Sequence, residues 1–183
     1  MKFLSTKIPG LIVIDPDIFE DKRGFFFECY HADKFKEGGI NDLFVQDNHS
    51  KSAQGTLRGL HYQLDPNSQA KLVRVISGEI FDVAVDIRKN SPTFGKWEGI
   101  VLSAENKKQF FVPRGFAHGF YVLSESTEVL YKCSTLYHPQ SDRSIHWNDP
   151  AVGIQWPIIS GLAPILSQKD EKAPLLNQAE INF

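Results

Sequence analysis

The sequence has little of what several large classes of protein depend on. Among its 183 residues are 2 cysteines, Cys29 and Cys133, which lie far apart and form no CxxC pair, so neither a disulfide framework nor a zinc ribbon is expected. A formal net charge of -2 at pH 7 provides no broad positive field for a nucleic-acid backbone. No apolar run reaches signal-peptide or membrane-span length, because Pro9, Gly10 and Pro16 interrupt the N-terminal stretch. A cytoplasmic protein with no nucleic-acid and no membrane partner is therefore expected.

Short β-type segments are abundant instead. The chain has 14 Phe but 1 Met, and short runs rich in Val, Ile, Phe and Tyr are separated by Gly, Pro, Asn and Ser, as is typical of an all-β sandwich or barrel. The predicted strands are Leu11–Ile14, Gly24–Tyr30, Leu43–Ser50, Gly55–Gln63, Lys71–Ser77, Glu79–Arg88, Trp97–Leu102, Gln109–Val112, Gly119–Leu123 and Thr127–Thr135. One helix is predicted over His31–Glu37 and a turn after Asp170. Length and the lack of a linker predict one domain over residues 1–183.

Alternation along the strands predicts which side chains share a face. Lys71 and Tyr131 each share a face with an otherwise apolar row, so each is expected to carry a polar group into the hydrophobic interior, where polar groups are costly without a partner or a task. Asp82 and Asp86 also share a face, which we interpret as a solvent-facing row. Gly78, between two strands, predicts a tight hairpin.

Three segments stand out as motifs: RGFFFE at Arg23–Glu28, LRGLHYQ at Leu57–Gln63 and PRGFAHGF at Pro113–Phe120. The last resembles the second conserved motif of the cupins, a jelly-roll superfamily. Where the first cupin motif supplies further metal ligands, this chain has HYQ, and His61 with His118 alone would hold a metal weakly. The expected fold is therefore a cupin-type jelly-roll (double-stranded β-helix) barrel with a few short peripheral helices and no metal.

Seven stretches together resemble the dTDP-4-dehydrorhamnose 3,5-epimerase family and occur in the family's order between about Arg23 and Asp170. They are DKRGFFFE, FVQDNHS, LRGLHYQ, KLVRVISGEIFDVAVDIRKNSPTFGKW, FFVPRGFAHGF, YKCSTLYHP and ILSQKD. The resemblance implies an isomerase that inverts C3 and C5 of dTDP-4-dehydro-6-deoxy-D-glucose through enolate intermediates, giving dTDP-4-dehydro-L-rhamnose, with no cofactor. Rhamnose synthesis is the usual destination of this product.

The resemblance also implies four catalytic residues. His61 is the expected base, since imidazole titrates close to working pH, and Asp170 is its expected carboxylate partner, which fixes the tautomer and stabilises the imidazolium. Tyr131 is the expected proton donor on the opposite face of the sugar. Lys71 is expected beside the C4 oxygen, where a preorganised donor is typically worth roughly 3 to 4 kcal/mol.

Substrate binding is implied for a larger set, which comprises Arg23, Phe26, Glu28, Gln46, Asn48, Ser50, Arg58, His118, Tyr137, Asp142 and Lys169. Arg23, Arg58 and Lys169 are candidates for the pyrophosphate, because cationic side chains, and arginine's planar fork in particular, match phosphate oxygens. Asp142 stands where the family commonly has glutamate. The residues of the RGFFFE segment are expected to reach into a neighbouring subunit's site, which predicts a homodimer with shared sites.

Each catalytic assignment has a structural alternative. His61 could be a hydrogen-bonded core residue, Asp170 a helix cap, Tyr131 a core aromatic with its hydroxyl at the rim, and Lys71 a side chain that snorkels to solvent. The competing functions are a single-centre epimerase, a 3,4-ketoisomerase, a metal-dependent cupin enzyme and a non-catalytic sugar-nucleotide binding module.

Overall fold

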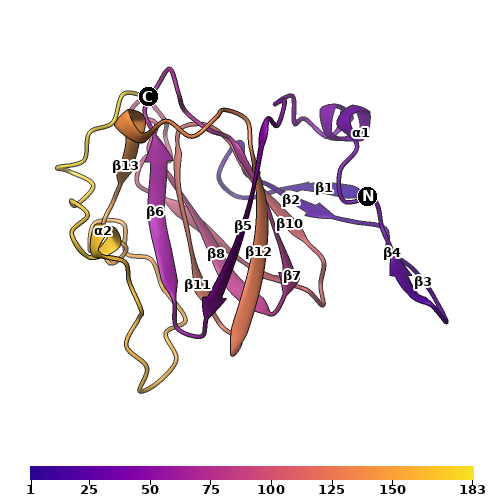
Figure 1. The fold of residues 1–183 in the computed structure, drawn as a ribbon. Coiled ribbons are helices and arrows are strands. Elements are labelled where there is room, and N and C mark those ends of the chain that lie inside the picture. Colours follow the sequence, from indigo (N-terminus) through magenta and orange to yellow (C-terminus); the bar gives the residue numbers. More distant parts are fainter.

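Antiparallel strands form the body of the computed structural model, which describes residues 1–183. In spatial order, the six-stranded sheet contains β1 (Lys2–Ser5), β2 (Ile12–Asp15), β10 (Gln109–Val112), β7 (Lys71–Ser77), β12 (Ser126–Cys133) and β5 (Gln46–Ala53). The five-stranded sheet contains β13 (Asp142–Ser144), β6 (Leu57–Gln63), β11 (Phe116–Val122), β8 (Glu79–Asp86) and β9 (Trp97–Ser103). The two sheets face each other (Figure 1). The expected cupin-type jelly-roll is confirmed.

Helical structure is confined to short peripheral pieces. Helix α1 (Ala32–Glu37) has His31 as its N-cap residue and Gly38 as its C-cap residue, in agreement with the predicted helix. The four-residue α2 (Gln168–Glu171) begins after Ser167. A single 3₁₀ turn covers Pro139–Ser141. None of the helices has the length and apolar content needed to cross a membrane.

Apolar side chains fill only part of the space between the sheets. The main core packs Val73 and Val75 of β7 with Phe110 of β10 and with Phe116 and Phe120 of β11. This core leaves the side between β5 and β6 to polar residues, and the pocket described below lies there. One side of the sandwich is therefore closed by apolar packing, and the other side holds a polar pocket.

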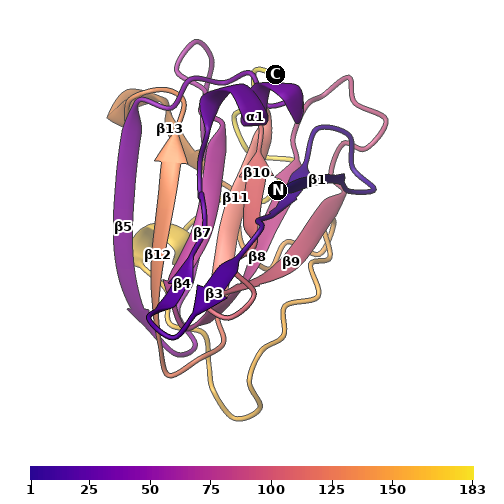
Figure 2. The same cartoon turned by 90° about the vertical axis from the view of Figure 1, so that its right-hand side faces the viewer.

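Both outer sheet faces are also covered. The segment from Ile145 to Phe183 packs over the five-stranded sheet and buries Val83 and Val85 of β8. Helix α1 packs Phe35 onto the six-stranded sheet, and Figure 2 shows it beside β7 and β10. Because β10 and β11 are buried on two faces, their sequences read as near-continuous apolar runs.

A separate hairpin of β3 (Phe19–Asp21) and β4 (Gly24–Phe26) projects from the body (Figure 1). Its aromatic side chains are exposed, with Phe19 64%, Phe25 59% and Phe26 70% accessible. Aromatic residues are rarely left this open on a surface without a partner. The strand predicted over Gly24–Tyr30 ends in fact at Phe26.

Two other predictions were wrong, one about the path of the chain and one about burial. Gly78 does not close a hairpin, because β7 and β8 belong to different sheets. The chain crosses between the sheets there with φ +79°, and an added Cβ would lie 2.3 Å from the Ser126 carbonyl oxygen, so the crossing needs glycine.

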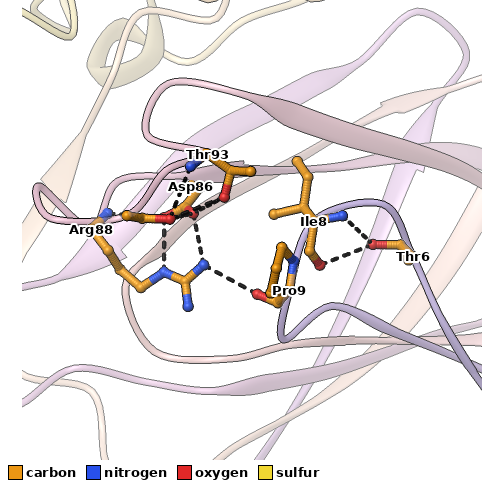
Figure 3. Close-up of polar contacts among 7 residues, drawn as sticks. Thr6, Ile8, Pro9, Asp86, Arg88 and Thr93 are labelled. Carbon is orange, nitrogen blue, oxygen red and sulfur yellow. Dashed lines mark hydrogen bonds and ion pairs between the residues drawn. The ribbon is translucent and has the colours of Figure 1, made fainter.

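The second error concerns Asp82 and Asp86, which are both fully buried and not solvent-facing. Asp86 accepts hydrogen bonds from Arg88, Ser91 and Thr93, and Arg88 also donates to the Pro9 carbonyl at 3.1 Å (Figure 3). Burial alone would raise the pKa of Asp86, but these donors lower it to about 2. Asp86 thus ties the β8–β9 connection to the N-terminal segment.

Candidate active site

The pocket has two walls, one from each sheet. On the six-stranded sheet, Asn48 of β5 and Tyr131 of β12 are register partners, and Lys71 of β7 pairs with Cys133 one row further on. We call this the tyrosine wall. On the five-stranded sheet, His61 of β6 and His118 of β11 are register partners, and we call this the histidine wall. Opposed residues in an antiparallel pair point to the same face, so both walls present their polar side chains to the space between them.

Two neighbouring cavities, which share lining residues, lie between these walls. The outer cavity, of about 250 Å³, is lined by polar groups that include Gln46, Gln69 and Lys169. The inner cavity, of about 200 Å³, is lined by Ser50 and His118 among others. His61, Lys71 and Tyr131 line both cavities. The predicted base and proton donor therefore share one compartment.

His61 is paired with Asp170, as predicted. Its Nε2 lies 2.5 Å from Oδ1 of Asp170, whose side chain is 3% exposed. With Nε2–H donating to the carboxylate, Nδ1 is the ring nitrogen left to accept a proton. The geometry is that of an oriented imidazole base.

The electrostatics of the pair suit a base at rest. Burial, with smaller effects from Lys71 and Lys169, lowers the pKa of His61 despite the opposing influence of Asp170. Burial would raise the pKa of Asp170, but hydrogen bonds from His61 and Ser167 and the charge of Lys169 lower it overall. A neutral imidazole beside an ionised carboxylate is the state that can remove a proton.

A second histidine–aspartate pair lies deeper in the same wall. Nε2 of His118 is 2.9 and 3.0 Å from the two carboxylate oxygens of Asp82, and both residues are buried. Asp82 was interpreted as part of a solvent-facing row, but both faces of β8 are buried: Ile80 and Ala84, on the face of Asp82, belong to the main core, and Val83 and Val85 pack under the C-terminal segment. The sequence did contain a signal for this pair: a carboxylate lies in an otherwise apolar predicted strand, and a histidine lies on the strand that neighbours it.

The tyrosine wall is held differently. Neither Lys71 nor Tyr131 makes a side-chain hydrogen bond or ion pair with another residue, and Ser50 Oγ is buried without a partner. Burial lowers the pKa of Lys71 and raises the pKa of Tyr131. Burial likewise raises the pKa of Cys133. Lys71, Tyr131 and Ser50 Oγ are therefore free to meet a ligand, whereas Cys133 Sγ accepts a hydrogen bond from Asn48 at 3.5 Å.

The outer cavity ends at a connected set of polar side chains. Asp142 accepts hydrogen bonds from Lys169 Nζ at 2.5 Å and from the Tyr137 hydroxyl at 3.1 Å. The backbone N–H of Tyr137 donates to Gln46 at 2.8 Å, and Gln63 accepts from the next N–H along the chain at 2.7 Å. Tyr137 is 55% exposed, so its ring is accessible to a ligand. Its backbone N–H and its hydroxyl are both held by hydrogen bonds.

The predicted substrate residues do not all come together in this chain. Arg23, Phe26 and Glu28 lie on or next to the projecting hairpin, where Arg23 pairs with Asp21 and Glu28 with Lys34. The three cations predicted for pyrophosphate are also apart. Arg58 lines the inner cavity and donates to Ser52 at 3.1 Å, whereas Lys169 lines the outer one.

The remaining predicted residues, Gln46, Asn48, Ser50, His118, Tyr137 and Asp142, line one or other cavity. Gln63 and Gln69 of the outer cavity were missed: Gln63 ends the LRGLHYQ motif but was given no role, and Gln69 lies outside every motif. No three His, Cys, Asp or Glu side chains are grouped closely enough to hold a metal ion.

With a carboxylate-paired histidine on one wall and hydroxyl and ammonium groups on the other, the fold and pocket together are those expected of a cupin-type acid–base enzyme. The family model described as dTDP-4-dehydrorhamnose 3,5-epimerase matches residues 5–178. A dTDP-4-dehydrorhamnose 3,5-epimerase of Salmonella typhimurium is 56% identical over 98% of this chain and 97% of its own length. The chain therefore belongs to the dTDP-4-dehydrorhamnose 3,5-epimerase family, and it is an isomerase.

Solved structures agree with this placement. The epimerase of Legionella pneumophila in complex with dTDP-4-keto-L-rhamnose is 53% identical, with a TM-score of 0.93 over 97% of this chain and 93% of that chain. A 3'-monoepimerase of Streptomyces bikiniensis in complex with dTDP-quinovose is more distant, at 34% identity and a TM-score of 0.88 over 94% of this chain and 86% of that chain.

Proposed function

We propose that this pocket carries out the family's double epimerisation with His61 as base and Tyr131 as proton donor. The reaction inverts C3 and C5 of dTDP-4-dehydro-6-deoxy-D-glucose to give dTDP-4-dehydro-L-rhamnose, a step of dTDP-rhamnose synthesis. The observation that carries the proposal is that His61, bonded to Asp170 at 2.5 Å, and Tyr131 line the same two cavities from opposite sheets.

The chemistry follows from the two walls. Nδ1 of His61 removes the proton next to the C4 ketone, and Asp170 stabilises the imidazolium that results. Negative charge then develops on O4, where the Lys71 ammonium stabilises it. His118, whose Nε2–H is held by Asp82, accepts a hydrogen bond from a sugar hydroxyl at Nδ1. Tyr131 returns a proton from the opposite wall. A proton leaving on one face and returning on the other inverts the carbon.

The outer cavity suits the nucleotide end of the substrate. Lys169 supplies a cation for the pyrophosphate, and Tyr137 offers an aromatic face on which a planar base can stack. Gln46 and Asn48 add polar contacts along β5, and the unpartnered Ser50 hydroxyl meets the sugar in the inner cavity. Asp142 binds Lys169 and Tyr137 and so acts by holding these two residues.

We also propose a homodimer in which the projecting hairpin completes a partner's site. The exposed Phe19, Phe25 and Phe26 form an apolar surface that a second copy would bury. Arg23 and Glu28 would then reach the partner's outer cavity, where Arg23 adds a second cation for the pyrophosphate. A cytoplasmic location remains a prediction, in keeping with two unpaired thiols.

Incubation with dTDP-4-dehydro-6-deoxy-D-glucose in D₂O tests the reaction. We expect deuterium at both C3 and C5 of an L-configured product. Label at C3 alone would identify a single-centre epimerase, and a product with its ketone at C3 would identify a 3,4-ketoisomerase. Undiminished activity after treatment with EDTA is expected, and its loss would favour a metal-dependent cupin enzyme.

A further inference from the structure

The carboxylate behind His61 is held by a residue to which no role has yet been assigned. Oδ1 of Asp170 accepts from His61, and Oδ2 accepts from the Ser167 hydroxyl at 2.8 Å. The same hydroxyl accepts the backbone N–H of Asp170 at 3.2 Å. Ser167 therefore contacts Asp170 twice, once as the N-cap of α2 and once as a donor to the carboxylate.

The segment that carries Ser167 is anchored to the strand of the base. Ile165 N–H donates to the Gly55 carbonyl at 2.9 Å, and Leu57 N–H donates back to the Ile165 carbonyl at 3.0 Å. These bonds fix the chain at the start of β6, which carries His61 four residues further on. Beyond Ser167, the Lys169–Asp142 pair ties α2 to β13. Ser167 thus starts α2 between two fixed points.

We propose that Ser167 is a positioning residue for epimerisation, because its hydroxyl fixes the Asp170 carboxylate in the orientation that supports His61 as base. The inference rests on the proposed roles of His61 and Asp170. Without the hydroxyl, Oδ2 loses its protein donor and the carboxylate can turn about its Cβ–Cγ bond, which weakens the bond of Oδ1 to the imidazole. A hydrogen bond to a charged group contributes about 1.5–3 kcal/mol, or roughly 10- to 100-fold in rate.

The pH profile should respond with a definite sign. The hydrogen bond and the charge of Asp170 raise the pKa of His61, so a carboxylate that turns away lowers this pKa. The other charged groups near the pair, Lys71, Lys169 and Asp142, are unchanged by a substitution at Ser167. The acidic limb of kcat/KM should therefore move to lower pH.

Four variants separate the donor role from helix capping. Ser167→Thr keeps a hydroxyl, and Ser167→Ala removes it. Ser167→Gly also removes the hydroxyl but remains a favourable N-cap residue, so the cap is largely preserved while the donor to the carboxylate is lost. Ser160→Ala is the matched control, because Ser160 is exposed on the same C-terminal segment and makes no side-chain hydrogen bond.

We expect Ser167→Ala and Ser167→Gly both to lower kcat about 10- to 100-fold, with KM within about twofold and the acidic limb shifted to lower pH. Ser167→Thr should restore most of the rate, and Ser160→Ala should match the wild type. Full activity in Ser167→Gly would reduce Ser167 to a cap and overturn the inference. Full activity in Ser167→Ala while His61→Asn is inactive would refute this inference alone, whereas an active His61→Asn variant would refute the proposed function itself.

Discussion

The two walls of the pocket hold their polar groups in opposite ways. On the histidine wall, His61 and His118 are each bonded to a buried carboxylate, Asp170 and Asp82. On the tyrosine wall, Lys71 and Tyr131 have no protein partner for their polar ends, and neither does Ser50 Oγ. A base must be oriented and electrostatically supported before the substrate arrives. A donor that stabilises a developing charge needs instead an N–H or O–H that no protein group occupies, so that it can bind the substrate. This contrast supports the proposed assignment of proton removal to the histidine wall.

Loss of the oriented base should give the largest effect. His61→Asn removes the titratable nitrogen but keeps the side chain polar, so turnover should fall at least about 10³-fold. Product NMR measures turnover, and equilibrium binding of dTDP should remain within about threefold. A variant that still exchanges both C3 and C5 at the wild-type rate would place the base elsewhere.

Loss of the ammonium on the tyrosine wall should be the next most severe. Lys71→Met should lower kcat about 10²- to 10³-fold, because a preorganised donor to the developing oxyanion is lost. Burial lowers the pKa of Lys71, so activity, which needs the charged form, should decline at a pH below the ordinary lysine range. Lys71→Arg, which stays charged, should lose that basic limb. An unchanged limb in this variant would assign it to another group.

The deeper carboxylate should have a smaller effect. Asp82→Asn leaves His118 in place but weakens its orientation, and we expect kcat to fall about 10- to 100-fold. Asp86→Asn is the matched control, since it lies on the same strand and is equally buried but contacts the Arg88 loop. The folded Asp86 variant should keep its kcat. Equal losses of kcat in both variants would show that Asp82 acts through the fold.

The control also makes a prediction of its own about stability. With a folded-state pKa of about 2 for Asp86 against an unfolded value near 4, the ionised carboxylate contributes roughly 2 to 3 kcal/mol above the unfolded pKa. This contribution is lost as pH falls from about 4 to about 2. Thermal melts at pH 7 should show Asp86→Asn lower by about 5 to 10 °C, and the gap to the wild type should close on acidification.

Ser50 should give the smallest effect. Its buried hydroxyl has no protein partner, so Ser50→Ala removes one contact to the sugar, worth about 3- to 10-fold in kcat/KM. Steady-state kinetics would measure this loss of kcat/KM. Ser52→Ala, a substitution on the same strand, would serve for comparison. A Ser50→Ala variant with unchanged kinetics would indicate that the hydroxyl does not meet the substrate.

The tyrosine wall could be predicted from the sequence better than the histidine wall could. Alternation placed Lys71 and Tyr131 on inward apolar rows, because β7 and β12 each have one such row facing the main core. It failed at Asp82, because both faces of β8 are buried and periodicity cannot tell which of two buried faces lines the pocket. The pairing of His61 with Asp170, 109 residues apart, came from the family resemblance and not from spacing.

Peripheral strands were the hardest to predict. The polar β13 is held by backbone pairing with β6, and β3 exists only as part of the exposed hairpin. Neither shows a period-two pattern against a core. The crossing at Gly78 was misread because a glycine with positive φ serves a hairpin and a change of sheet equally well.

Hydrogen exchange by a Tyr131→Phe variant in D₂O tests the division of labour between the walls most directly. If His61 removes the proton and Tyr131 returns one from the opposite wall, the variant should still exchange the C5 hydrogen of dTDP-4-dehydro-6-deoxy-D-glucose. It should do so with retention of configuration, while formation of the L-configured product falls at least about 10²-fold. Exchange lost together with inversion, or inversion that continues unchanged, would contradict the account.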